Sequence, residues 1–125
     1  MKSYTDLEQS TKLAMILPLE SADMRYHTIS HYNPYPCDEI VYTIEFNRAS
    51  GKDIPCWSLA KLCELMEVEY KIEKTYLDQS DFCTYSFIFE GFPDGQPGYY
   101  RTYEREEMID AAVEFIEFLK RNELL

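Results

Sequence analysis

The sequence predicts an α+β fold, in which a mostly antiparallel sheet of four or five strands carries three helices on one face. Three consecutive segments within 68–104 alternate apolar and polar residues with a period of two, as strands with one buried face do. Residues 4–17, 55–66 and 105–122 instead repeat apolar positions every three or four residues, which indicates amphipathic helices. With 125 residues, the chain is expected to form a single α+β domain over 1–125, in the order α-β-β-α-β-β-β-α.

The first helix is expected over residues 4–17. Thr5 followed by Glu8 is a capping-box start, and Pro18 prevents the helix from continuing. Two strands are then expected over 24–31 and 40–47. The segment between them contains two prolines, which cannot donate to a ladder, so it is predicted to be a hairpin loop.

The second helix is expected over 55–66, because proline suits a first turn, where its missing N–H costs nothing. The strands over 68–77, 82–90 and 99–104 follow, and 83–90 is expected to be central because it is the most apolar. The last helix is expected over 105–122. Six residues are predicted to be buried between sheet and helices: Ile44, Ile72, Tyr85, Phe87, Phe115 and Leu119.

The charge balance constrains the partners. The chain has 23 Asp and Glu against 12 Lys and Arg, a formal charge of −11, which argues against binding nucleic acid through its phosphates. A basic protein partner, or solubility alone, fits better. No apolar run reaches the roughly 20 residues of a membrane span, and no motif indicates a cofactor. The four cysteines have no paired spacing and the N-terminus has no apolar signal, so a cytoplasmic protein with reduced thiols is expected.

Cys56 is the candidate catalytic residue. In the first turn of a helix its thiol would lie near unpaired N–H groups, which favour the thiolate. The Pro-Cys-Trp-Ser segment resembles the Cys-Trp step at the nucleophile of papain-like proteases, but those enzymes need a histidine downstream, and here His27 and His31 lie upstream. Cys56 is therefore either the nucleophile of a small thiol-dependent enzyme or a small apolar core residue.

His27, His31 and Cys37 carry side chains that suit zinc. In a strand, however, two residues four apart lie about 13 Å from each other, too far to share one ion. The spacing therefore favours ordinary strand or loop histidines over a metal site.

Four acidic residues of the last predicted helix recur at helical spacing, about 5–6 Å apart along one face. They either form a solvated helix face, or they imitate DNA phosphates or bind a basic protein partner. These residues are Glu106, Asp110, Glu114 and Glu117.

Two predicted helices carry more apolar surface than one sheet face requires. Trp57 lies opposite the core stripe of the second helix, and Ile109, Val113 and Phe118 flank that of the last. Either the chain covers them itself, Trp57 by the first helix or by the loop at 34–36, or they form the patch of a homodimer or the docking site of a partner.

Residues 4–10 with 16–24, residues 55–60 and residues 108–114 resemble short uncharacterised proteins carried by phage-like and other mobile elements of anaerobic gut bacteria. The resemblance implies a cytoplasmic accessory protein and brings no known activity or site residue. Together with the acidity, it favours a non-enzymatic protein-interaction module. The alternative is a small thiol-dependent enzyme centred on Cys56.

Overall fold

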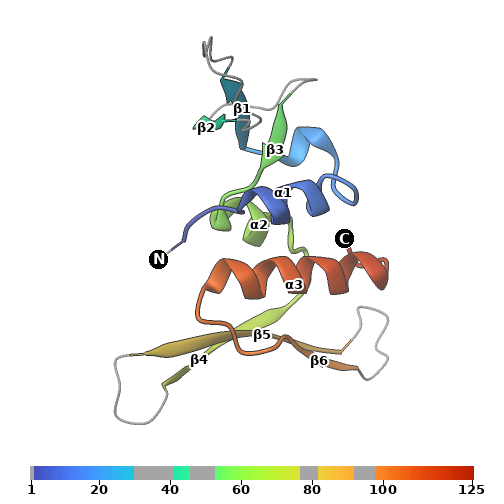
Figure 1. Ribbon diagram of the computed structural model, residues 1–125. Coiled ribbons are helices and arrows are strands. Elements are labelled where there is room, and N and C mark those ends of the chain that lie inside the picture. Colours follow the sequence, from blue (N-terminus) through green and yellow to red (C-terminus); the bar gives the residue numbers. More distant parts are fainter. Residues whose placement is uncertain (1, 30–40, 46–52, 77–81, 92–97) are drawn as a thin grey trace.

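The computed structural model describes residues 2–29, 41–45, 53–76, 82–91 and 98–125 (Figure 1). At residues 28–29 and 41–43 it describes the backbone alone. The elements are α1 (Leu7–Leu13), a 3-10 turn (Leu19–Ser21), β1 (Met24–Ile29), β2 (Val41–Glu45), β3 (Ile54–Cys56), α2 (Leu59–Leu65), β4 (Tyr70–Tyr76), β5 (Cys83–Glu90), β6 (Tyr99–Arg101) and α3 (Met108–Arg121).

The strands form two antiparallel three-stranded sheets, β2-β1-β3 and β4-β5-β6. In Figure 1, α1 and α2 lie beside the first sheet, and α3 lies between these helices and the second sheet. The α+β class, the antiparallel pairing and the three helices are confirmed. The predicted single sheet of four or five strands, and an element order without β3, differ from this arrangement.

β3 was missed because Pro55 suits both a helix start and a sheet edge. It lies opposite Arg25 of β1, and β3 pairs with no other strand among the described residues. An edge strand tolerates proline, since the missing N–H lies on the unpaired side. The second helix therefore starts later than predicted, with Ser58 as its N-cap: the Ser58 hydroxyl accepts the N–H of Lys61 at 3.1 Å.

The cap of α1 also differs from the prediction by one residue. Asp6 and Gln9 form the capping box: the Asp6 carboxylate accepts the Gln9 N–H at 2.8 Å, and the Gln9 side chain accepts the Asp6 N–H at 3.0 Å. Thr5, the predicted cap, is instead fully buried. α1 ends at Leu13, four residues earlier than expected.

α3 is buried on two sides, because the second sheet packs against one face and the other helices against another (Figure 1). Phe87 of β5 stacks against Phe115 of α3, and Phe89 meets Phe118 edge to face, with ring centroids 5.5 Å apart in each pair. The buried residues of α3 are Ile109, Ala111, Ala112, Val113, Phe115, Ile116, Phe118 and Leu119.

Four of the six predicted core residues are buried: Tyr85, Phe87, Phe115 and Leu119. Ile44 is half-buried, and Ile72 is 41% exposed, so the prediction for Ile72 is wrong. Ile72 does lie on the predicted face of the sheet, the one that α3 covers. It is exposed because it belongs to the edge strand β4, whereas α3 packs mainly over β5.

The alternating pattern predicts that the second face of β5 is exposed to solvent, but this face is also buried. Thr84, Ser86 and Ile88 are each less than a tenth exposed. Long side chains from the neighbouring strands cover this face. Glu73 of β4 lies opposite Ser86, and Arg101 of β6 lies opposite Ile88. The Arg101 guanidinium pairs with the Glu73 carboxylate at 2.7 Å, and this ion pair spans the central strand.

Candidate functional site

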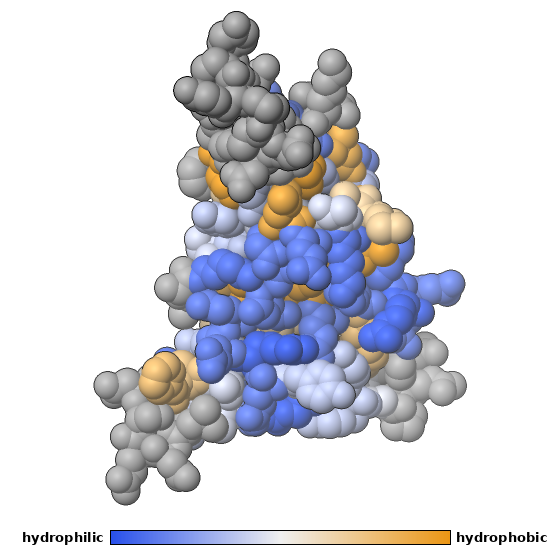
Figure 2. All heavy atoms as spheres, viewed as in Figure 1, coloured by the Kyte–Doolittle hydropathy of each residue, from blue (hydrophilic) through white to orange (hydrophobic). Residues whose placement is uncertain are grey.

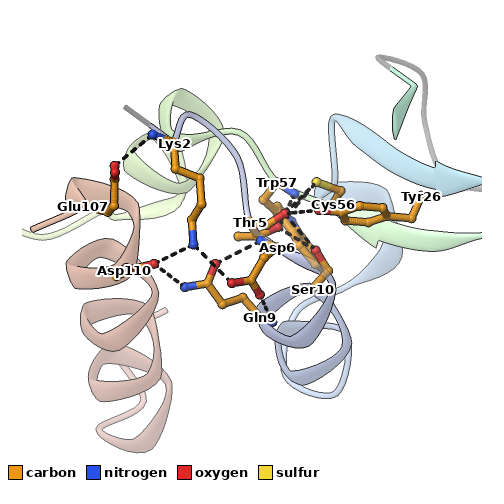
Figure 3. A network of polar contacts seen from close by, with 10 residues as sticks. All are labelled: Lys2, Thr5, Asp6, Gln9, Ser10, Tyr26, Cys56, Trp57, Glu107 and Asp110. Carbon is orange, nitrogen blue, oxygen red and sulfur yellow. Dashed lines mark hydrogen bonds and ion pairs between the residues drawn. The ribbon is translucent and has the colours of Figure 1, made fainter. Parts of the chain in front are cut away.

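Thr5 is the centre of a buried polar network that joins the N-terminal segment to β1 and β3 (Figure 3). Its hydroxyl accepts the N–H of Trp57 at 3.1 Å and lies 2.7 Å from the hydroxyl of Ser10. Its carbonyl accepts the Tyr26 hydroxyl at 2.7 Å and the Cys56 thiol at 3.4 Å. The network links elements 51 residues apart and gives its buried polar groups partners.

Cys56 is part of this network and is fully buried. It belongs to β3 rather than to the first turn of a helix, so the predicted stabilisation of its thiolate does not apply. Burial instead raises the pKa of the Cys56 thiol, although hydrogen bonds from Thr5 and Ser10 oppose the shift. An inaccessible thiol with a raised pKa is the reverse of an activated nucleophile.

Trp57 is also fully buried, and its indole N–H donates to the Ser21 hydroxyl at 3.0 Å. Ser21 belongs to the 3-10 turn, and Leu13 of α1 lies in the same core cluster as Trp57. Ile109 and Val113 are buried too. Of the two predicted alternatives, burial within the chain is the one observed, and the expected docking patch with Trp57 as its anchor is not on the surface. The loop at 34–36 lies outside the described residues.

The acidic residues of α3 are paired within the chain. The Asp110 carboxylate lies 2.8 Å from the Lys2 ammonium and accepts the Gln9 side-chain amide at 2.7 Å (Figure 3). Glu117 pairs with Lys12 of α1 at 2.9 Å. These contacts hold α3 against the N-terminal segment and α1.

Glu114 binds the segment before α3: it accepts the backbone N–H of Tyr103 at 2.9 Å and pairs with Arg105 at 3.2 Å. Glu106 is exposed. Figure 2 shows hydrophilic residues gathered over α1 and α3, where a groove of about 400 Å³ contains both acidic and basic side chains. Three of the four predicted partner-binding acids therefore have structural partners, and the surface they share is mixed rather than purely acidic.

His27 lies beside a buried carboxylate on the first sheet. Its Nδ1 is 2.8 Å from Asp53, whose side chain is 4% exposed and also pairs with Arg25 at 2.9 Å. In the part of the chain that the structure describes, no three His, Cys, Asp or Glu residues lie close enough to hold a metal ion. His31 and Cys37, the other predicted ligands, lie outside those residues.

β4 offers an open strand edge, and the hydrogen bonds of β5 show which backbone groups it presents. Tyr85 exchanges backbone bonds with Arg105 at 2.7 and 3.0 Å, and the Phe87 carbonyl accepts the Thr102 N–H at 3.0 Å. The odd-numbered residues of β5 therefore turn their backbone groups toward β6. Because these directions alternate in an antiparallel strand, the even-numbered residues turn toward β4.

The partners of those even-numbered residues are Lys71, Glu73 and Thr75, so these three residues bond to β5. The alternate residues of β4 point their N–H and C=O groups away from the sheet, and β5 is the only strand paired with β4 among the described residues. The outward residues are Tyr70, Ile72, Lys74 and Tyr76. The alternating pattern of the sequence does not reveal this edge, although Lys74 on the apolar face is a typical sign of one.

The longest helix among the described residues, α3, spans 14 residues. None of the helices in the ranges described is long and apolar enough to cross a membrane. The chain matches no protein-family model, no curated protein and no solved structure.

Proposed function

We propose that this protein is an acidic, non-enzymatic accessory protein that binds a protein partner through the free edge of β4. The observation that carries the proposal is the set of outward backbone groups along this seven-residue strand. Proteins use such edges to add an extended segment of a partner as a further strand. The main-chain bonds supply affinity, and the side chains beside the edge supply specificity.

The side chains of the edge support the same function. Ile72 is 41% exposed and Tyr76 is 65% exposed, and both lie on strand positions that an added strand would cover. Lys74 lies over the ring of Tyr76, 5.2 Å from its centroid. The surface therefore combines apolar area with charge, which favours a specific partner over indiscriminate strand pairing.

The net charge of −11 favours a partner with basic residues, because opposite charge speeds encounter. A cytoplasmic role in a phage-like or other mobile element is part of this proposal. That part is supported only by the resemblance of residues 4–10 with 16–24, 55–60 and 108–114 to proteins of such elements.

The proposal can be tested with extended peptides selected from a random display library. Lys74→Pro removes one outward N–H while the bonds from β4 to β5 remain, and Lys74→Ala is the matched control that keeps the N–H. Peptide binding should shift the amide resonances of β4, fail with Lys74→Pro and persist with Lys74→Ala. Circular dichroism should show that both variants are folded. Equal binding to both variants, or a library that yields no binder, would overturn the proposal.

A further inference from the structure

We infer that the strand that fits the β4 edge is β4 of a second copy of this chain, paired antiparallel with Ile72 opposite the second copy's Ile72. The inference rests on the proposed function, since it uses the same edge, and it names the occupant. A second copy has the same net charge of −11, so self-pairing depends on the local charge pairs along β4 and not on long-range attraction. The product is a continuous six-stranded sheet, in which α3 of both copies lies on the same face.

The backbone restricts the possible registers. The outward groups belong to even-numbered residues, so a strand pairing with its own copy must place even positions opposite even positions. The two-fold axis must then lie level with one residue of the strand, so that this residue lies opposite its own copy. Three registers pair at least five residues of each β4, centred on Ile72, Glu73 or Lys74.

Charge selects one of the three. Centring on Glu73 or Lys74 places that residue opposite its own copy, so like charges meet at the axis, which is destabilising. Centring on Ile72 places Lys71 opposite the second copy's Glu73, and by symmetry this opposite-charge pair forms twice. The Lys71 and Glu73 side chains are 76% and 47% exposed. Lys71 already lies 3.9 Å from Glu90 and Glu73 lies 2.7 Å from Arg101, so each would gain a second partner of opposite charge in the dimer.

The remaining pairs of this register are also compatible. Ile72 meets an identical side chain, and the contact covers apolar surface that is exposed in the single chain. Tyr70 lies opposite the second copy's Lys74, an arrangement that places an ammonium beside an aromatic ring. Lys74 already lies near the rings of Tyr76 and Tyr85, at 5.2 and 5.9 Å from their centroids.

Sedimentation equilibrium of charge-reversal variants over a micromolar concentration series tests this pairing. Lys71→Glu and Glu73→Lys each turn both ion pairs into like-charge pairs, so each variant should dimerise about tenfold more weakly than wild type. The double variant, Lys71→Glu with Glu73→Lys, restores opposite charges and should dimerise like wild type.

Mixing the two single variants gives a sharper result. In the mixed dimer, the glutamate introduced by Lys71→Glu on one copy lies opposite the lysine introduced by Glu73→Lys on the other. The unchanged Glu73 of the first copy lies opposite the unchanged Lys71 of the second, so both pairs have opposite charges. The mixture should dimerise although each variant alone does so weakly. This rescue cannot be explained by misfolding of either variant.

Two outcomes would overturn the inference. If the wild type stays monomeric throughout the series while selected peptides still bind β4, self-pairing is wrong and the proposed strand-binding function stands. If a dimer forms that neither charge reversal nor Lys74→Pro weakens, its interface lies elsewhere.

Discussion

Phe87 of β5 and Phe115 of α3 stack at the centre of the larger core, with their rings 5.5 Å apart and inclined by 26°. Both side chains are fully buried. Phe87→Ala should therefore lower the free energy of unfolding by about 3–5 kcal/mol, through lost burial and the cavity that remains. Urea denaturation measures the change. Phe82→Ala is the control, because Phe82 is 68% exposed and its loss should have little effect.

The hydroxyl of Thr5 should contribute more to stability than its small size suggests. Thr5→Val keeps the shape of the side chain but leaves the Trp57 N–H and the Ser10 hydroxyl without this partner in a buried site. The expected loss is about 1–3 kcal/mol in the free energy of unfolding. Thr11→Val, at an exposed position of α1, provides the comparison. Equal losses for the two variants would contradict the role assigned to the network.

Stability should fall in alkali because of Cys56. Burial raises the pKa of its thiol in the folded state, so the unfolded chain releases this proton first. The folded state is therefore most favoured below the unfolded thiol pKa of about 8.5 and loses stability as pH rises through it. Burial also raises the pKa of the Tyr26 phenol, which adds a loss in the same direction at higher pH.

Urea denaturation of wild type at about pH 7.5 and about pH 9.5 should show this loss, and Cys56→Ala should show a smaller one between the same two conditions. The comparison uses the change with pH within each protein, so any general destabilisation by the substitution cancels. An identical change in both proteins would assign the alkaline loss to other groups.

Asp110 and Glu106 distinguish a structural acidic stripe from a partner-binding one. Asp110→Asn weakens the ion pair with Lys2, and we expect it to cost about 0.5–1 kcal/mol, less at high salt, since the pair is partly exposed. Glu106→Gln, at an exposed position, should leave the melting temperature unchanged. A larger loss from Glu106→Gln than from Asp110→Asn would reverse the roles assigned to the two residues.

Local sequence patterns predicted the helices and strands that pack against segments close to them in the chain. The alternation over 83–90 predicted β5 and its central place, because a strand flanked on both sides and covered by a helix requires apolar residues. Pro55 misled the prediction, because its local preference suits two structures. The pairing with Arg25, 30 residues earlier in the chain, decides between them, and no local pattern records that pairing.

The candidate site was hidden for a similar reason. Alternation over 70–76 identifies the two faces of β4, but it does not identify which strand lies beside it or which backbone groups remain outward. Those facts follow from the bonds of Tyr85 with Arg105 on the far side of β5. The burial of Trp57 likewise depends on residues far away in the chain, since its indole donates to Ser21 and packs in the same core cluster as Leu13.

The ties between Lys2 and α3 affect the order in which the molecule can assemble. The Lys2 ammonium binds Asp110 across 108 residues, and its backbone N–H donates to Glu107 at 2.8 Å. During synthesis, the N-terminal segment cannot take its final position until α3 has left the ribosome. Closing so long a loop slows folding, because its entropy is lost before these contacts form. A nascent chain that still lacks α3 leaves the apolar face of β5 uncovered, and this intermediate is the one that chaperones would have to protect.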